Sequence, residues 1–367
     1  MSEPSEIKLV AADTPPPGRT GGIRGVERVN PLEAGDWDAM LLACPGSSFF
    51  HTAAWARVLH RTYGYTPAYF TRREAGHLQA LLPVMEVDSW LTGRRGVSLP
   101  FTDDCEPLCL DGGGFDGIMQ ALMNYGAERD WNYLECRGGK TLFGDAPAST
   151  SFYGHRLSLA GGDEALFAKV ESPVRRAVRK AEKEGVTVEF AQSLDAMRTF
   201  YALHCKTRTR HGLPPQPFLF FQNIHEFVVA QNHGFVVVAR HRGVPVACNV
   251  YFHWGKNAIY KYGASDEAYQ QLRANNLVMW EAIRWYGRQN FEQLHFGRTS
   301  LTNQGLRRFK LGWGTEEHGV EYVRYDRRKK EFVTVKDESS GWHSYVFHRM
   351  PGFLSKWVGG VLYKHMA

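Results

Sequence analysis

The sequence predicts an α/β (α+β) protein built from two similar domains. Its 367 residues are too many for one ordinary core, because a domain usually holds about 150 residues. Strand-like and helix-like segments alternate along the chain, and each half shows a strand hairpin, then a helix, then another strand. With 43% hydrophobic and 13% aromatic residues, the composition is that of a well-packed globular protein. Two copies of one fold are therefore expected, without visible sequence identity between them.

The first half opens with helices and continues with strands. Residues 31–42 and 52–59 fit short helices that carry Trp37 and Trp55. Strands are expected at 66–71 and 78–87, since Ala75 and Gly76 supply a hairpin turn between two apolar runs. The remaining expected elements of this half are a short lead-in at 96–100, a loop at 101–107, a helix at 115–129 and a strand at 132–136.

The second half repeats this order, beginning with a helix at 174–184. Ser172 suits a cap, Pro173 suits the first turn, and Gly185 ends the helix. The elements expected after it are a strand at 186–190, a helix at 193–208, strands at 234–240, 244–253 and 257–265, a helix at 276–288 and a strand at 291–296.

One face of the helix at 174–184 is basic and the opposite face is apolar. At about 100° per residue the basic face holds Arg175, Arg176, Arg179, Lys180 and Lys183. Like charges four residues apart repel each other, so the stripe favours either an anionic ligand or a solvated face. A nucleic-acid binder is a third hypothesis, although no aromatic residues are interleaved with the stripe.

Charge and cysteine content restrict the class of protein. A net charge of +6 and a pI near 8.9 favour anionic partners, including phosphorylated small molecules. The six cysteines form no CxxC pair and read as reduced thiols. The N-terminus lacks the basic start and apolar run of a signal peptide, so we expect a flexible tail at 1–25 and a cytoplasmic location.

The C-terminal region, 336–367, is expected to be a helical tail. Residues 342–367 mix aromatic side chains with lysines and histidines around Pro351. This mixture is compatible with peripheral contact with a membrane surface, but it is more typical of a helix docked on its own core.

The segment Leu294–Gly314 holds the densest chemistry. A strand-like run ends at Gly297 and Arg298, a polar loop follows, and 307–310 then bring three cations and Phe309 in front of a glycine pair. Strand ends of this kind commonly present catalytic groups. The alternative is a basic surface hairpin with its apolar residues turned inward.

Two further segments favour anion binding. In the segment 207–215 a helix runs out into a Gly and Pro loop, where Arg210 either caps the helix or holds a phosphate. In the segment 257–276 a strand carrying Tyr260 and Tyr262 leads through a loop into a helix, an order that cradles a pyrophosphate on backbone amides in acyl-CoA enzymes. The positions where glycine is preferred hold Arg273 and Asn275, so side chains crowd this approach.

Other catalytic patterns are missing from the sequence. There is no GxSxG, P-loop or HExxH motif, and no histidine shows metal-ligand spacing, so we expect no metal. Nucleophilic catalysis by Cys105 or Cys109 would require a partner base that the sequence does not place.

Taken in order, these blocks resemble the FemABX-like proteins of the GNAT acyltransferase superfamily. The blocks are 172–186, 207–212, 260–276 and 297–314, together with FFHTAAWARVLHRTYGY and the SLPF run at 98–101. The resemblance covers roughly residues 28–335. It implies two tandem GNAT-like domains, at 26–160 and 161–335, each with a mixed and mostly antiparallel sheet flanked by helices, and an active cleft chiefly in the second.

The resemblance also implies roles for individual residues. Lys310, paired with Phe309, is similar to a family lysine at the transferring carbonyl, where it would stabilise an oxyanion or accept a proton. Arg210 resembles an arginine that grips the acceptor's phosphate, and Tyr260 or Tyr262 resembles a tyrosine of the cleft. The other residues expected to bind substrate are Arg298, Asn276 and Arg179, and those expected to bind the donor are Gln271, Arg273 and Asn275.

The predicted function is an acyltransferase or aminoacyltransferase that works by direct attack of an amine. The resemblance implies acyl-CoA or aminoacyl-tRNA as donor and an anionic or glycan-linked acceptor related to the cell envelope or an exopolysaccharide. Two departures bear on this: residues 102–107 read TDDCEP in place of a Gly-Gly-Pro turn, and the family's tRNA-binding coiled coil has no counterpart. The alternative is a binding or scaffold protein that keeps the fold without catalysis.

Overall fold

The computed structural model describes residues 25–110, 114–335 and 358–365. Most of the expected tail at 1–25 and of the expected region at 336–367 therefore lies outside the described residues. The elements of the first half are β1 (Val26–Val29), α1 (Trp37–Leu42), η1 (Phe49–His51), α2 (Ala53–Tyr63), β2 (Thr66–Pro67), β3 (Tyr69–Glu74), β4 (His77–Leu82), β5 (Met85–Ser89), β6 (Gly93–Val97), β7 (Leu108–Cys109), α3 (Phe115–Glu128), β8 (Tyr133–Arg137), η2 (Lys140–Phe143) and β9 (Thr150–Ser158).

The second half holds the longer helices and the longer sheet strands. Its elements are α4 (Gly162–Lys169), α5 (Ser172–Lys183), β10 (Val186–Ala191), α6 (Leu194–Arg210), α7 (Phe218–Ile224), η3 (His225–Val229), β11 (Gly234–His241), β12 (Val244–Trp254), β13 (Asn257–Ser265), η4 (Glu267–Leu272), α8 (Ala274–Arg288), β14 (Gln293–Ser300), α9 (Gln304–Leu311), β15 (Glu316–Asp326), β16 (Glu331–Phe332) and, near the C-terminus, η5 (Tyr363–His365). None of the helices in the described part of the chain is long and apolar enough to cross a bilayer.

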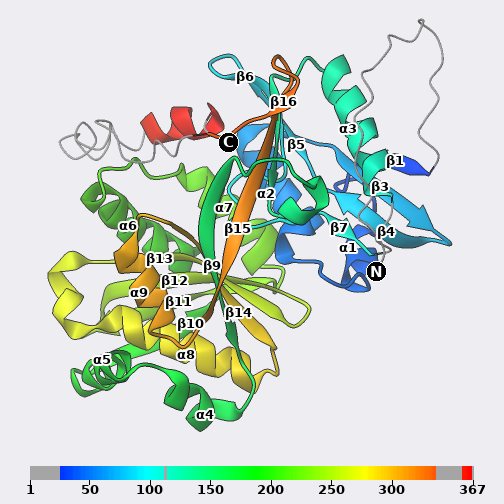
Figure 1. Ribbon diagram of the computed structural model, residues 1–367. Helices are drawn as coiled ribbons and strands as arrows, with labels where there is room; N and C mark the ends of the chain where they lie inside the picture. The colour runs from blue at the N-terminus through cyan, green and yellow to red at the C-terminus, as the bar shows by residue number, and fades with distance from the viewer. Residues whose placement is uncertain (1–24, 111–113, 336–357, 366–367) are drawn as a thin grey trace, which may run out of the picture.

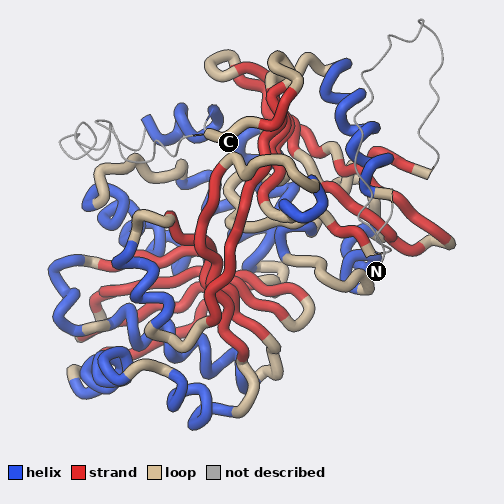
Figure 2. The backbone as a smooth tube through the Cα atoms, viewed as in Figure 1, coloured by secondary structure: helices blue, strands red, loops and turns tan. Residues whose placement is uncertain are grey.

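The described strands form one large and one small sheet (Figures 1 and 2). The large sheet has twelve strands in the order β10-β11-β12-β13-β14-β9-β15-β8-β6-β5-β2, with β16 beside β15. The small sheet has the order β1-β3-β4-β7. Neighbouring strands are antiparallel except for β13 with β14 and β6 with β8. A mixed, mostly antiparallel α/β architecture was predicted from the sequence, and the structure confirms it.

Two long strands, β9 and β15, join the halves of the molecule. β9 pairs with β14 along one edge and with β15 along the other. β15 pairs with β9 through Glu316 to Tyr322 and then with β8 through Tyr322 to Asp326. Figure 1 shows both strands running side by side from the second half into the first. The chain thus builds one continuous sheet, in which β9 has second-half strands on both of its edges.

Helices cover both faces of the second-half sheet because its strands are apolar on both sides. In β11, Val236 and Val238 point to the cluster that contains Phe200 of α6. The alternate residues Phe235 and Val237 point to the cluster that contains α5 and α8. Successive side chains of a strand point to opposite faces, so the near-continuous apolar run of β11 requires a helix layer on each side.

The described end of the chain packs against the rest of the protein. The Arg208 side chain donates a hydrogen bond to the Tyr363 hydroxyl at 2.6 Å, and the Tyr65 hydroxyl donates to the Lys364 carbonyl at 2.9 Å. Arg95 donates to the His365 carbonyl at 2.8 Å. Residues 358–365, the described part of the region considered for membrane contact, therefore tie α6 to the first half.

Several expected elements differ from the structure. The single strand expected at 78–87 is two strands, β4 and β5, which separate at Pro83 and join different sheets. The helix expected at 31–42 begins only at Trp37, and the polar loop expected before Lys310 contains helix α9. Proline lacks the amide hydrogen that a continuous strand ladder needs, which explains the break at residue 83.

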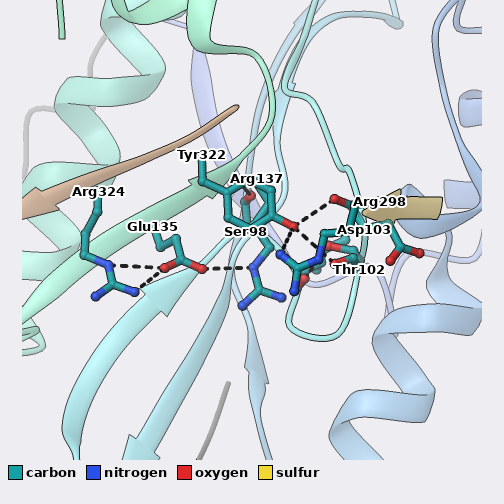
Figure 3. A network of polar contacts seen from close by, with 9 residues as sticks. Ser98, Thr102, Asp103, Glu135, Arg137, Arg298, Tyr322 and Arg324 are labelled. Carbon is teal, nitrogen blue, oxygen red and sulfur yellow. Dashed lines mark hydrogen bonds and ion pairs between the residues drawn. The ribbon is translucent and has the colours of Figure 1, made fainter. Parts of the chain in front are cut away.

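A buried carboxylate connects β8 with β15 where the halves meet. Glu135 accepts hydrogen bonds from Arg137 at 2.9 Å and from Arg324 at 3.2 Å, as Figure 3 shows. Arg137 and Glu135 are both almost fully buried. Burial raises the pKa of Glu135, but the two guanidinium groups lower it more, and the result is about 2. This charge arrangement holds the crossing strand β15 against the first-half sheet.

Replacing Glu135 with Ala should destabilise the protein by about 3 kcal/mol, because Arg137 then stays buried without a counter-charge. Urea unfolding at pH 7 measures the change, and Glu321→Ala, an exposed glutamate on β15, is the control. Because the folded pKa of Glu135 is depressed, its stabilisation is present above the unfolded pKa and disappears as the pH falls toward about 2. Equal stabilities of the two variants at pH 7 would contradict the role given to Glu135.

Candidate functional site

A cleft opens between the end of α6 and the start of α8. It consists of two adjoining hollows of about 330 and 250 Å³, and both are lined by Arg210, His211, Ser265 and Asn275. The outer hollow also contains Arg273 and Asn276, and the inner one Tyr260 and Phe309. The fold therefore brings together six of the residues expected from the sequence: Arg210, Tyr260, Arg273, Asn275, Asn276 and Phe309.

Two cations in this cleft have no partner. Neither Arg210 nor Arg273 makes a hydrogen bond or an ion pair through its side chain with any described residue. By contrast, the nearby Lys206 is neutralised by Asp266 at 2.5 Å. Unpaired guanidinium groups that converge on a hollow are suited to a phosphate or carboxylate ligand.

The start of α8 adds backbone donors to the same hollow. Arg273 takes the position before the first helical residue with a φ of +58°, a left-handed conformation that glycine adopts most easily. No side chain caps the helix, and Ala274, Asn275 and Asn276 of its first turn line the outer hollow. Helix starts carry amide groups without helical partners and a partial positive charge. The backbone at residue 273 thus has the conformation that glycine favours, although the residue is an arginine.

The inner hollow lies along β13, beyond the point where β13 and β14 separate. Their parallel pairing covers only Asn257 to Ile259 on β13 and Gln293 to His295 on β14. A bulge then follows His295, where Gly297 has a φ of +70°. Beyond it the facing edges of the two strands share no ladder, so their backbone groups are available to a ligand placed between them.

Lys310 supports this bulge from α9. Its ammonium is buried, with 3% exposure, and donates hydrogen bonds to the carbonyls of Gly297 and Arg298, both at 2.9 Å. Burial lowers the pKa of Lys310 to about 8, with Lys261 and Arg298 acting in the same direction and Asp103 opposing them. Phe309, the preceding residue, lines the inner hollow, whereas Lys310 itself points to β14.

The loop at 101–107 of the first half reaches the other side of the bulge. Lys261 on β13 donates hydrogen bonds to the Asp103 carboxylate at 2.9 Å and to the Phe101 carbonyl at 2.7 Å. Burial raises the pKa of Asp103, but Lys261 and Arg298 outweigh this effect and lower it. Sequence reasoning missed Lys261. The sequence feature that could have identified it is a lysine placed between Tyr260 and Tyr262 in a largely apolar strand.

Four expected site residues lie elsewhere. Arg298 donates a hydrogen bond to the Tyr322 hydroxyl at 2.7 Å (Figure 3), and Tyr262 packs with Phe200 and Phe221 beneath α6. Arg179 is exposed on α5, 5.6 Å from the ring of Phe167, and Gln271 is exposed in η4. The basic stripe of α5 is thus largely solvent-exposed and separate from the residues that line the cleft.

Residues 168–318 match the family described as Acetyltransferase (GNAT) domain. This part of the chain is a GNAT domain. The match covers the elements from α5 to α9 and hence the whole cleft. The match confirms the GNAT domain that the sequence blocks indicated for this part of the chain. No curated protein matches the chain.

Solved structures share the fold over most of the chain. A crystal structure of FemX has a TM-score of 0.64 at 12% identity and covers 81% of this chain and 96% of its own. The L-PGS structure from Bacillus licheniformis has a TM-score of 0.54 at 13% identity, with 83% and 94% covered. A tandem GNAT protein from the clavulanic acid biosynthesis pathway has 0.51 at 10%, with 82% and 97% covered. The expected tandem GNAT-like architecture is confirmed.

The buried position of Lys310 makes the stability of the protein depend on pH. Between about pH 8 and 10.5 the unfolded chain retains a proton on this lysine that the folded chain has released, so the free energy of unfolding should rise with pH. Relative to Lys310→Met, the wild type should gain up to about 3 kcal/mol across this range. Denaturant unfolding at several pH values measures this gain, with Lys256→Met, an exposed lysine, as control. Parallel curves for wild type and Lys310→Met would contradict the assignment.

Proposed function

We propose that the protein transfers an acyl or aminoacyl group from a donor held in the cleft to an amine by direct attack. No covalent intermediate on the enzyme is required. The observation that carries this proposal is the convergence of Arg210, Arg273 and the start of α8 on one hollow that continues to the gap between β13 and β14. Such a site has the charge for a phosphate-bearing donor at one end and open backbone edges for its acyl arm at the other.

Lys310 is proposed as the residue that stabilises negative charge on the reacting carbonyl. An ammonium has three N–H donors, and two of them are held by Gly297 and Arg298. In this proposal the third N–H donor is the one that acts on the reacting carbonyl. With a pKa near 8 this lysine is mostly protonated at neutral pH, which favours oxyanion stabilisation over a role as base.

A cysteine nucleophile receives no support from the geometry. Cys105 Sγ lies 3.7 Å from His51 Nε2, which superficially resembles a nucleophile and its base. However, His51 Nε2 also lies 2.9 Å from the Glu106 carbonyl, and burial lowers the pKa of His51 to about 4. Burial raises the pKa of Cys105 well above its usual value, so its reactive thiolate form is suppressed.

The donor is proposed to be acyl-CoA or aminoacyl-tRNA, and the acceptor an anionic or glycan-linked molecule of the cell envelope or an exopolysaccharide. Both donors present phosphate groups, which suit Arg210 and Arg273. A domain of similar fold comes from a protein described as a putative lysylphosphatidylglycerol synthetase, a name that joins an aminoacyl group to a phospholipid. The alternative function, a binding or scaffold protein without catalysis, would use the same cleft for its ligand.

Removing the Arg273 side chain should weaken binding of coenzyme A about 5- to 10-fold, which corresponds to about 1 to 1.4 kcal/mol. The variant is Arg273→Gly, and its matched control is Arg242→Gly in the turn between β11 and β12, where φ is +51°. Both changes relieve the same backbone conformation, but only the first removes a charge from the cleft. Calorimetric titration with coenzyme A measures the effect. Equal affinities for the two variants would contradict a donor phosphate at this position.

Replacing Lys310 with Met should lower turnover at least about 100-fold while leaving donor affinity within about twofold, because the ammonium acts on the transition state. Turnover is followed as thiol release from acetyl-CoA, and as loss of the aminoacyl group from alanyl-tRNA, with a mixture of amines as acceptors. Wild-type turnover should fall as the pH rises through about 8. A rate that rises through this pH would indicate a base instead. Donor binding without any turnover by the wild type would favour the scaffold function.

A further inference from the structure

Three buried polar atoms without hydrogen-bond partners meet beside the β14 bulge. They are Oδ1 of Asp104, Nε2 of His295 and Nε2 of His318. These side chains come from the loop at 101–107, from β14 and from β15, and one ligand atom of each lies within 4.8 Å of the others. Buried polar atoms normally have a partner, so three orphans around one point indicate that an atom from outside the chain belongs there.

Two glycines lie directly against two of these atoms. A Cβ on Gly138 would collide with the Asp104 carboxylate, and a Cβ on Gly154 would collide with the His318 ring. The backbone of β9 therefore passes directly behind His318, and the turn after β8 passes behind Asp104. Neither position tolerates a side chain, so the close packing against Asp104 and His318 requires glycine at both.

The hydrogen bond to His295 determines which donors and acceptors this group of atoms presents to a ligand. The Gly297 amide donates to Nδ1 of His295 at 3.0 Å, so in the neutral ring Nε2 carries the proton. Burial keeps the ring neutral, since it lowers the pKa of His295 to about 3. His295 thus provides an N–H donor. Burial raises the pKa of Asp104 to about 7, and its ionised carboxylate provides an acceptor.

This combination of donor and acceptor selects the ligand. A metal ion needs a lone pair on the ring nitrogen, which the Nε2 of His295 lacks in this tautomer. An anion would be repelled by the Asp104 carboxylate. An ammonium would find a second donor, the N–H of His295, where it needs an acceptor. A hydroxyl group fits, because it accepts one hydrogen bond and donates another.

The group of atoms is close both to the surface and to the proposed site of transfer. Arg156, whose side chain is 46% exposed, places Nη2 3.8 Å from Oδ2 of Asp104 and so links the group to a surface residue. On the other side, His295 precedes by two residues Gly297, whose carbonyl holds Lys310. A ligand held here would lie next to the bulge, on the side covered by the first-half loop.

We propose that Asp104, His295 and His318 form a subsite that binds a hydroxyl group of the acceptor, which makes the acceptor a polyhydroxylated amine such as an amino sugar. This inference rests on the proposed function. It assigns the loop at 101–107, where the sequence departs from its relatives, to recognition of the acceptor. A single bound water would satisfy the same three atoms, and the experiment must separate the two.

The test is saturation-transfer NMR with two amines that differ in their hydroxyl groups, glucosamine and cyclohexylamine. Wild type and His77→Gln, an exposed histidine on β4, should bind glucosamine alike. Asp104→Asn and His318→Gln should weaken glucosamine binding at least fivefold and leave cyclohexylamine unaffected. Unfolding transitions of all variants verify that they are folded.

Equal binding of the two amines, or no binding of glucosamine by the wild type, overturns the proposal and leaves a structural water as the occupant. Stoichiometric binding of Zn²⁺ alone to the wild type but not to His318→Gln also overturns it, in favour of a metal. Coenzyme A affinity is measured on the same samples and should be unchanged in Asp104→Asn. Failure of the hydroxyl subsite is therefore distinguishable from failure of the donor cleft.

Discussion

The pairing of β9 with β15 is the constraint on which the rest of the structure depends. Each strand runs through both halves, so the position of the first-half loop at 101–107 relative to β14 is set by backbone hydrogen bonds. The Tyr322 hydroxyl on β15 donates to the Asp103 carbonyl at 2.8 Å and fixes the loop at that point. A hinge between two separate domains would not provide such a fixed position. The site between the halves is therefore preorganised by the sheet.

Charge is concentrated where this loop meets the bulge. Lys261, Lys310 and Arg298 all act on the Asp103 carboxylate and lower its pKa. Three cations around one carboxylate leave an excess of positive charge in a largely buried region. Burial of two ammonium groups costs stability, which proteins usually tolerate where charge has a function. An oxyanion that develops during acyl transfer would be stabilised by this excess.

The sequence predicted the second half better than the first for identifiable reasons. Helix α8 and strands β11 to β13 carry long periodic patterns, and the blocks around Arg210 and Tyr260 stand in a characteristic order, so the cleft was anticipated. The β9 and β15 strands were missed because they carry polar residues whose partners only the tertiary fold provides, such as His155 and Glu317, which pair with each other. The same holds for Lys261, whose burial depends on Asp103 from a distant loop.

Position in the sequence also failed to predict the direction in which some side chains point. Lys310 and Phe309 are adjacent, yet on helix α9 they point to different places, one to the β14 carbonyls and one to the cleft. Arg179 belongs to a regular basic face, but no strand or loop brings it to the cleft. Periodicity identifies a helix face, whereas packing decides which cavity that face meets.

The contact between Tyr363 and Arg208 links residues 358–365 to the end of α6, which borders the cleft. Arg208 lies two residues before Arg210, and its guanidinium is anchored on the Tyr363 hydroxyl and on the Pro214 carbonyl. A proteolytic cut or a fusion that draws residues 358–365 away from the body would loosen the last turn of α6. The position of Arg210 thus depends on a contact made by residues more than 150 positions away in the sequence.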